Sequence, residues 1–178
     1  MKAKRPYADM RRLADALVDR LSPVCARIEI AGSIRRKQAE IGDIELIAIP
    51  RPRLDLFGQA TGQTEVDLLL AQWPVELTKD GEKYKQFTVT TTHGHPVQVD
   101  LFLQPDPATW GVNMLIRTGP ANFSKKMVTP KRSGGWMPDA YTVRDARIWL
   151  PYERMETPEE EDVFRLYGLE YIEPEYRR

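Results

Sequence analysis

The sequence is poor in the residues that build disulfides and zinc sites. Cys25 is its one cysteine, and His93 and His95 are its two histidines. A single thiol cannot form a disulfide within the chain or a thiolate cage around a metal ion. This composition favours an intracellular compartment and argues against a zinc-dependent fold or a zinc active site.

Long apolar runs are also lacking. No run approaches the roughly 18 residues that a membrane-spanning helix needs. The basic N-terminal segment of residues 1–6 is not followed by the apolar stretch of a secretion signal. We therefore expect a soluble, cytoplasmic protein with no membrane partner. Its 178 residues, 42% of them hydrophobic, suffice for one domain or two small lobes with a buried core.

The chain also has no net charge, because 26 basic residues balance 26 acidic ones. This balance argues against binding of nucleic acid by overall charge. The charges are segregated, however. Residues 107–138 contain no acid, whereas residues 159–162 are four acids in a row. The cations of the acid-free stretch are Arg117, Lys125, Lys126, Lys131 and Arg132. Two solvated faces would explain this pattern, as would a basic strip for a polyanion.

Hydrophobic periodicity predicts an α+β protein. We expect helices over residues 7–21 and 65–73, and strands over 27–31, 43–49, 75–78, 84–92 and 96–103, with a loop over 53–63. Pro105 and Pro107 mark a boundary between lobes. Beyond it we expect helices over 110–116 and 121–128, a hairpin over 141–150, and a helix capped by Thr157 that ends at Gly168.

The residues with the clearest chemistry are a Gly-Ser pair and three strand acids. Gly32 and Ser33 follow a predicted strand and open a short basic stretch, an arrangement that offers N–H groups and a hydroxyl to phosphate. Asp43 and Glu45 are two residues apart on a strand and so share a face. Asp100 lies inside an apolar strand, where a carboxylate needs a cation or a donor.

Each of these features alone also has a structural explanation: a turn at Gly32-Ser33, a capping acid at Asp43 and a buried ion pair at Asp100. Their combination favours phosphoryl transfer. Carboxylates on neighbouring strands can hold two divalent cations, which is the arrangement that activates a hydroxyl and neutralises a departing pyrophosphate.

Two segments resemble the signature of the nucleotidyltransferase superfamily. They are residues 31–36 (AGSIRR) and 42–46 (GDIEL). The Gly-Ser-x-Arg-Arg form is similar to the family X DNA polymerases, the group of DNA polymerase β. Residues 99–101 (VDL) lie where that family places its third metal-binding Asp. Residues 116–120 (IRTGP), with Phe123 and Lys125, resemble its sugar-contacting turn and the next helix, and residues 159–174 resemble its C-terminal tail.

The resemblance implies a minimal polymerase with two lobes, similar in layout to small viral members of the family and of viral or bacterial type. Residues 1–105 would form a nucleotidyltransferase palm with a mixed β-sheet and flanking helices. Residues 106–178 would form a small C-terminal α/β lobe that selects the nucleotide, like a thumb.

The resemblance also implies roles for individual residues. Two Mg²⁺ ions, for which Mn²⁺ can substitute, would be bound by the three carboxylates of Asp43, Glu45 and Asp100. The triphosphate would be held by Gly32, Ser33, Arg36 and Gly42, and Gly119 would contact the sugar and base, with Arg117 as a further nucleotide contact. Apart from the resemblance, Lys83 and Lys85 lie on a predicted strand on either side of Tyr84, where they would form a solvated face or neutralise DNA phosphates. Lys125 and Lys126 of the basic stretch are further candidates for DNA contacts.

Three positions depart from the family pattern. Glu45 stands in place of the second metal-binding Asp, and Gln98 in place of an Arg two residues before the third acid. Ile116-Arg117 replaces a Tyr-Phe pair that rejects ribose in the family. We therefore expect weaker discrimination against ribonucleotides.

Three functions are compatible with these residues. The favoured one is a monomeric DNA polymerase that adds a nucleotide from a dNTP to a primer 3′-OH on primer-template or gapped DNA, in repair or replication. A nucleotidyltransferase with another acceptor, such as an RNA end, a protein or a small molecule, would use the same chemistry. A non-enzymatic scaffold is disfavoured because all three carboxylates and the Gly-Ser pair are present.

Overall fold

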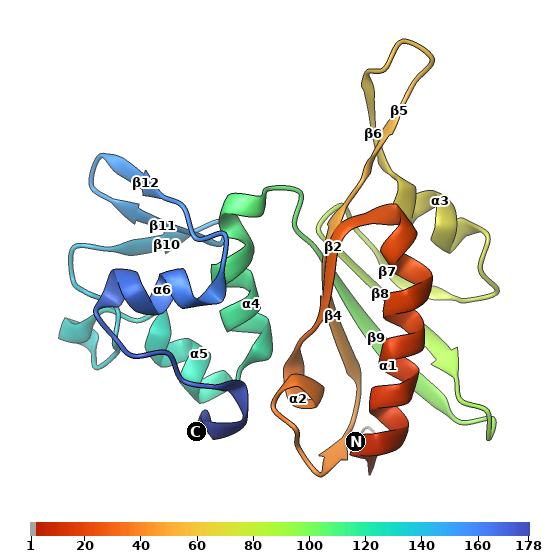
Figure 1. Ribbon diagram of the computed structural model, residues 1–178, viewed down its shortest axis with the longest axis horizontal. Helices are drawn as coiled ribbons and strands as arrows, with labels where there is room; N and C mark the ends of the chain where they lie inside the picture. Colours follow the sequence, from red (N-terminus) through yellow and green to blue (C-terminus); the bar gives the residue numbers. More distant parts are fainter. Residues whose placement is uncertain (1–2) are drawn as a thin grey trace. The chain divides into compact units, whose positions relative to one another are not determined.

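The computed structural model describes residues 3–178, which divide into two compact units (Figure 1). One unit comprises Met1–Ile30 and Gln38–Pro105, and the other comprises Ala31–Lys37 and Asp106–Arg178. The segment Ala31–Lys37 therefore packs with the C-terminal part of the chain, although the sequence suggested one continuous lobe over residues 1–105.

The first unit is built on a five-stranded sheet with the strand order β2-β4-β9-β8-β7. Its strands are β2 (Cys25–Ile30), β4 (Ile44–Pro50), β7 (Leu77–Asp80), β8 (Tyr84–Thr90) and β9 (Pro96–Leu103). β4 and β9 run parallel, whereas the other neighbouring pairs are antiparallel. The predicted mixed sheet of an α+β fold is confirmed.

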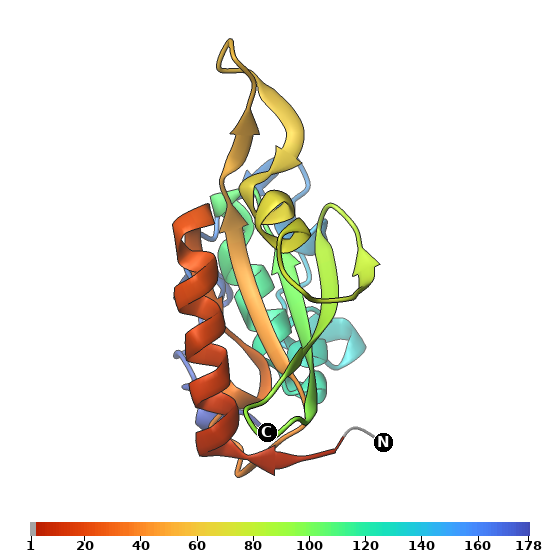
Figure 2. The same cartoon turned by 90° about the vertical axis from the view of Figure 1, so that its right-hand side faces the viewer.

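One face of this sheet is covered by α1 (Tyr7–Leu21) and α3 (Glu65–Ala71). Figure 2 shows α1 lying along the strands. α1 presents one apolar stripe, the buried residues Met10, Ala14, Leu17 and Leu21, because residues three to four apart share a helix face. Alternate residues of the sheet, including Leu46 and Leu101, are fully buried. The side chains of Glu45 and Asp100 point to the opposite face.

The segment predicted as a loop over residues 53–63 is instead a two-stranded ribbon of β5 (Pro52–Leu54) and β6 (Ala60–Thr64). Its turn is organised by Asp55, whose Oδ1 accepts hydrogen bonds from the backbone N–H groups of Phe57 and Gln59. Asp is a frequent turn former for this reason, so the signal was present in the sequence. A second small ribbon pairs β1 (Arg5–Pro6) with β3 (Glu40–Ile41).

The second unit contains four helices and a three-stranded sheet. The helices are α2 (Gly32–Arg35), α4 (Trp110–Thr118), α5 (Ala121–Met127) and α6 (Glu160–Tyr167). The strands are β10 (Thr142–Arg144), β11 (Arg147–Leu150) and β12 (Glu153–Met155), of which β12 was not predicted. Their shared core consists of Val112, Leu115, Phe123, Met127, Met137, Ile148, Val163, Phe164 and Tyr167.

α6 begins later than the sequence suggested. Its cap is Glu159 rather than Thr157, and Glu159 forms a capping box with Asp162. The Thr157 hydroxyl is instead buried and donates to the carbonyl of Ala108. The predicted end at Gly168 is confirmed, since this glycine has the left-handed conformation (φ 66°) that glycine adopts most readily.

Candidate active site

The parallel pairing of β4 with β9 brings two of the predicted metal-binding acids side by side. In the register of these strands Glu45 is the direct partner of Asp100. Directly opposed residues of neighbouring strands point to the same face, so both carboxylates lie on the face that α1 and α3 leave uncovered. Asp43 immediately precedes β4, two residues from Glu45, and is half-buried. Gly42, the predicted triphosphate contact beside it, is also half-buried.

Asp100 is 8% exposed and is held by three neutral donors. Its Oδ1 accepts hydrogen bonds from the Tyr84 hydroxyl at 2.6 Å, from Gln86 Nε2 at 2.8 Å and from Gln98 Nε2 at 2.9 Å. The Tyr84 ring stacks on Phe102 with the ring centroids 5.0 Å apart. The burial of this carboxylate is therefore offset by hydrogen bonds from uncharged groups.

Tyr84 and Gln86 were not predicted as partners of Asp100. The signal lay in the hairpin of β8 and β9. The turn around Gly94, between the predicted strands over 84–92 and 96–103, fixes the register, which places Gln86 opposite Asp100 and Tyr84 two residues away on the same face. Pairing the two predicted strands residue by residue would have found both.

The three predicted metal ligands are all carboxylates, and carboxylate oxygens suit a hard divalent cation. Glu45 and Asp100 share a face, and the side chains that donate to Asp100, Tyr84, Gln86 and Gln98, are all uncharged. Over residues 3–178, however, His, Cys, Asp and Glu side chains nowhere gather as a group of three or more that could hold a metal ion. Binding of Mg²⁺ by Asp43, Glu45 and Asp100 stays a prediction.

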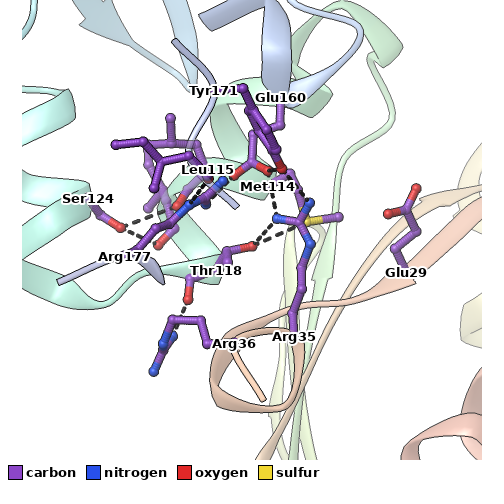
Figure 3. Close-up of polar contacts among 12 residues, drawn as sticks. Glu29, Arg35, Arg36, Met114, Leu115, Thr118, Ser124, Glu160, Tyr171 and Arg177 are labelled. Carbon is purple, nitrogen blue, oxygen red and sulfur yellow. Dashed lines mark hydrogen bonds and ion pairs between the residues drawn. The ribbon is translucent and has the colours of Figure 1, made fainter. Parts of the chain in front are cut away.

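The predicted phosphate-binding segment lies in the second unit. Gly32 is buried, has φ +60° and begins α2, and Ser33 follows it half-buried. The strand-Gly-Ser-helix element expected from the sequence is confirmed. The Arg36 guanidinium donates to the carbonyl of Thr118 (Figure 3). A Cβ on Gly119 (φ +69°) would lie only 3.0 Å from Arg36 Nη1, so the structure brings together these two predicted nucleotide contacts.

Arg35, the neighbour of Arg36, belongs to a buried ionic network around Glu160 (Figure 3). Arg35 Nη1 donates to Glu160 Oε2 at 2.7 Å and to Thr118 Oγ1 at 2.7 Å. From the C-terminal segment, Arg177 Nη1 donates to Glu160 Oε1 at 2.5 Å and the Tyr171 hydroxyl donates to Oε2 at 2.9 Å. The network joins α2, α4, α6 and the last residues of the chain.

The partners of Glu160 determine its ionisation. Burial alone would raise the pKa of this carboxyl, but the hydrogen bond from Arg177 and the charge of Arg35 outweigh it, so its pKa is lowered. The Arg177 guanidinium in turn lies over the rings of Phe123, Phe164 and Tyr171, at 5.1 to 5.6 Å from their centroids.

The burial of Glu160 was not predicted, because residues 159–162 are a run of four acids. A signal was available, because Glu160 shares its helix face with Val163, Phe164 and Tyr167, which are three, four and seven residues further on. Periodicity would have placed this one acid toward the core.

The basic stretch of the second unit is on the surface. Lys125 and Lys126 on α5 are exposed, as are Lys131 and Arg132 in the following turn. The Lys126 ammonium lies 5.3 Å from the centre of the Trp136 ring. Arg117, on α4, is half-buried. These four exposed cations, close together in the sequence, are called the basic strip below.

In the first unit Lys83 is exposed, but the prediction of a DNA contact at Lys85 is wrong. Strand alternation sends Lys85 to the face covered by α3, where it is 4% exposed and forms ion pairs with Asp67, at 2.6 Å, and with Asp80. Burial works to lower its pKa, but the hydrogen bonds with Asp67 and Asp80 outweigh burial and the pKa is raised. Lys85 is a charge inside the fold and cannot meet DNA phosphates.

Comparison with known proteins bears on the second unit. Residues 113–178 match the family model described as DNA polymerase beta thumb. A search of curated proteins gave no match. The thumb match supports a relationship to family X polymerases and points to a DNA polymerase that binds DNA. No helix within residues 3–178 combines the length and the apolar character needed to cross a membrane.

Substitution of Glu160 by Gln should lower the free energy of unfolding by about 3 kcal/mol, since it leaves the buried Arg177 and the half-buried Arg35 without their counter-charge. The wild-type pKa lies below the ordinary value of 4.5. The stabilisation that ionised Glu160 provides is therefore complete above about pH 4.5 and is lost as the pH falls through the folded-state pKa. Denaturant unfolding across pH 3 to 7 tests both effects. The exposed neighbour Glu161→Gln is the control, and an equal effect in both variants would contradict this role.

DNA affinity should depend steeply on salt through the basic strip. Neutralisation of about four phosphates gives a slope of roughly −4 in log K against log salt. Replacing Lys125 and Lys126 by Gln should reduce this slope by about two, whereas Arg144→Gln, an exposed cation outside the strip, should leave it unchanged. Fluorescence anisotropy with labelled gapped DNA measures the slope, and an affinity independent of salt would refute the assignment.

Proposed function

We propose that this chain is a Mg²⁺-dependent DNA polymerase of the family X type. It would transfer a nucleotide from a dNTP to a primer 3′-OH with release of pyrophosphate, and fill short gaps in repair or replication. The match of residues 113–178 to the polymerase beta thumb carries the proposal. The paired carboxylates of Glu45 and Asp100 on one face of the sheet support it.

We assign the reacting end of the nucleotide to the carboxylates of the first unit. Asp43, Glu45 and Asp100 would hold Mg²⁺, which when bound lowers the pKa of an attacking hydroxyl and neutralises pyrophosphate. The donors Tyr84, Gln86 and Gln98 fix the orientation of the Asp100 carboxylate. A fixed carboxylate can also accept the proton of the hydroxyl.

We assign nucleotide binding to Gly32, Ser33, Arg36 and Gly42 for the triphosphate, and to Arg117 and Gly119 for the sugar and base. Gly119 has φ +69° and lies close to Arg36, so a residue with a side chain would be strained here, which suits a backbone surface that meets a ligand closely. The exposed strip with Lys125 and Lys126 would bind the primer-template, with Lys83 as a further phosphate contact. We expect a monomer.

Replacing the proposed metal ligands should abolish nucleotide transfer. Asp43→Ala and Asp100→Asn should each lower kcat/KM by 10³-fold or more, equivalent to about 4 kcal/mol of transition-state stabilisation. Asn at position 100 retains an oxygen for Tyr84, Gln86 and Gln98, so stability should change little. Extension of a labelled primer with dNTP and Mg²⁺, on gapped DNA, primed DNA and RNA, measures the loss.

The exposed acid Asp19 on α1 supplies the matched control, Asp19→Asn, which should retain wild-type activity. Substantial transfer by either ligand variant would refute the metal assignment. Activity on an RNA end but not on DNA would favour a nucleotidyltransferase with another acceptor.

Discrimination against ribonucleotides should be weak, because Ile116-Arg117 precedes Thr118-Gly119 where the resembled family has an aromatic pair. Ile116 has no aromatic ring, and it packs against the core of the second unit, so this position does not form the aromatic surface that excludes ribose in the family. Shape alone discriminates by only ~1–3 kcal/mol. The ratio of kcat/KM for a dNTP and its ribo counterpart on one gapped substrate should stay below about 10³, or about 4 kcal/mol. A larger ratio would show that another element excludes ribose.

A further inference from the structure

The tip of the β5–β6 ribbon exposes apolar side chains to an unusual degree. Five large hydrophobic residues are exposed within residues 3–178, and three of them lie here: Leu54 (54%), Leu56 (100%) and Phe57 (87%). Figures 1 and 2 both show the ribbon extending away from the five-stranded sheet. Exposed apolar groups that gather in this way mark a contact with a partner.

The tip is a turn held by hydrogen bonds. Asp55 Oδ1 accepts hydrogen bonds from the N–H groups of Phe57 at 2.8 Å and Gln59 at 2.9 Å, and the Asp55 N–H donates to the Gln59 carbonyl at 2.8 Å. Gly58 adopts φ +78°, which closes the turn. Leu56 and Phe57 are thereby held at the outermost point of the ribbon.

The charge of the ribbon favours an anionic partner. Between residues 51 and 64 the charged groups are Arg51, Arg53 and Asp55, a net charge of +1. The one acid directs its Oδ1 at two backbone N–H groups within the turn, which offsets its charge locally. The remaining exposed polar groups, such as those of Gln59 and Gln63, are neutral and can donate hydrogen bonds.

The small apolar area distinguishes between kinds of partner. A stable protein interface buries about 800 Å² on each side, far more than two or three side chains provide. DNA-binding proteins, by contrast, use one or two Leu or Phe side chains as a wedge between base steps, and stacking on an aromatic ring is worth ~1–3 kcal/mol per base. β-ribbons with cationic and amide side chains are known readers of DNA grooves.

We propose that the β5–β6 ribbon is a DNA-binding arm. Arg51 and Arg53 contact phosphates, and Leu56 and Phe57 insert where base stacking is interrupted, as at the edge of a gap. A gap lowers the cost of insertion because its bases are already partly unstacked. The inference rests on the proposed function, because it takes DNA as the substrate. It adds that the ribbon makes the protein bind gapped DNA more tightly than continuous duplex.

The test uses the full chain and two labelled DNAs, a continuous duplex and the same duplex with a one-nucleotide gap flanked by 2-aminopurine. Wild-type protein should change the 2-aminopurine emission and prefer the gapped DNA. The double variant Leu56→Ser/Phe57→Ser should lose that emission change and bind gapped DNA about 10-fold more weakly, with duplex affinity unchanged. The control is Tyr152→Ser, which removes another exposed aromatic side chain, from the turn just before β12. This variant should match wild type.

The outcomes separate this inference from the proposed function, because nucleotide transfer is assayed in parallel. Intact transfer and unchanged gap binding in the double variant would overturn the DNA-binding arm alone, and would point to a protein partner for the tip. Tip-dependent gap binding without nucleotide transfer would refute the polymerase assignment while the arm stands. Wild-type protein that binds neither DNA would overturn the inference.

Discussion

The parallel pairing of β4 with β9 is the constraint on which the chemistry of the first unit depends. It places Glu45 directly opposite Asp100, and the antiparallel pairing of β9 with β8 places Gln86 on the other side of the same acid. A slip of one residue would turn Glu45 toward the α1 face, where Leu46 now lies fully buried. The packing of α1 against that face therefore also fixes the position of the carboxylates.

A second constraint acts through Glu160 in the other unit. Its carboxylate is shared by Arg35 and Arg177, so a four-residue helix is held by contacts from the far end of the chain. α2 is too short to be stable by its own hydrogen bonds. The conformation of Gly32 and Ser33, to which phosphate binding is assigned, thus depends on packing against α6 and the C-terminal residues.

Features whose cause lies in neighbouring residues could be predicted from the sequence, whereas features that depend on contacts between distant residues could not. The helix over residues 7–21 and the strands that carry Glu45 and Asp100 were predicted, because their apolar periodicity is a local signal. The burial of Lys85 was not, since its ion pair with Asp67 forms only once α3 packs on the sheet. Glu160 was likewise hidden, because its partners Arg35 and Arg177 are 125 and 17 residues away. Metal binding itself stays a prediction at all three acids.

The surroundings of Asp100 explain how a buried carboxylate can remain available to a cation. Gln98 stands where the resembled family has an Arg, and Gln86 and Tyr84 complete the set of donors. A guanidinium would bring a positive charge to Asp100, whereas the three side chains that donate to it here are neutral. Three of the four hydrogen bonds converge on Oδ1, and Oδ2 accepts one from Gln98 at 3.0 Å. Neutral donors thus offset the cost of burial and orient the group.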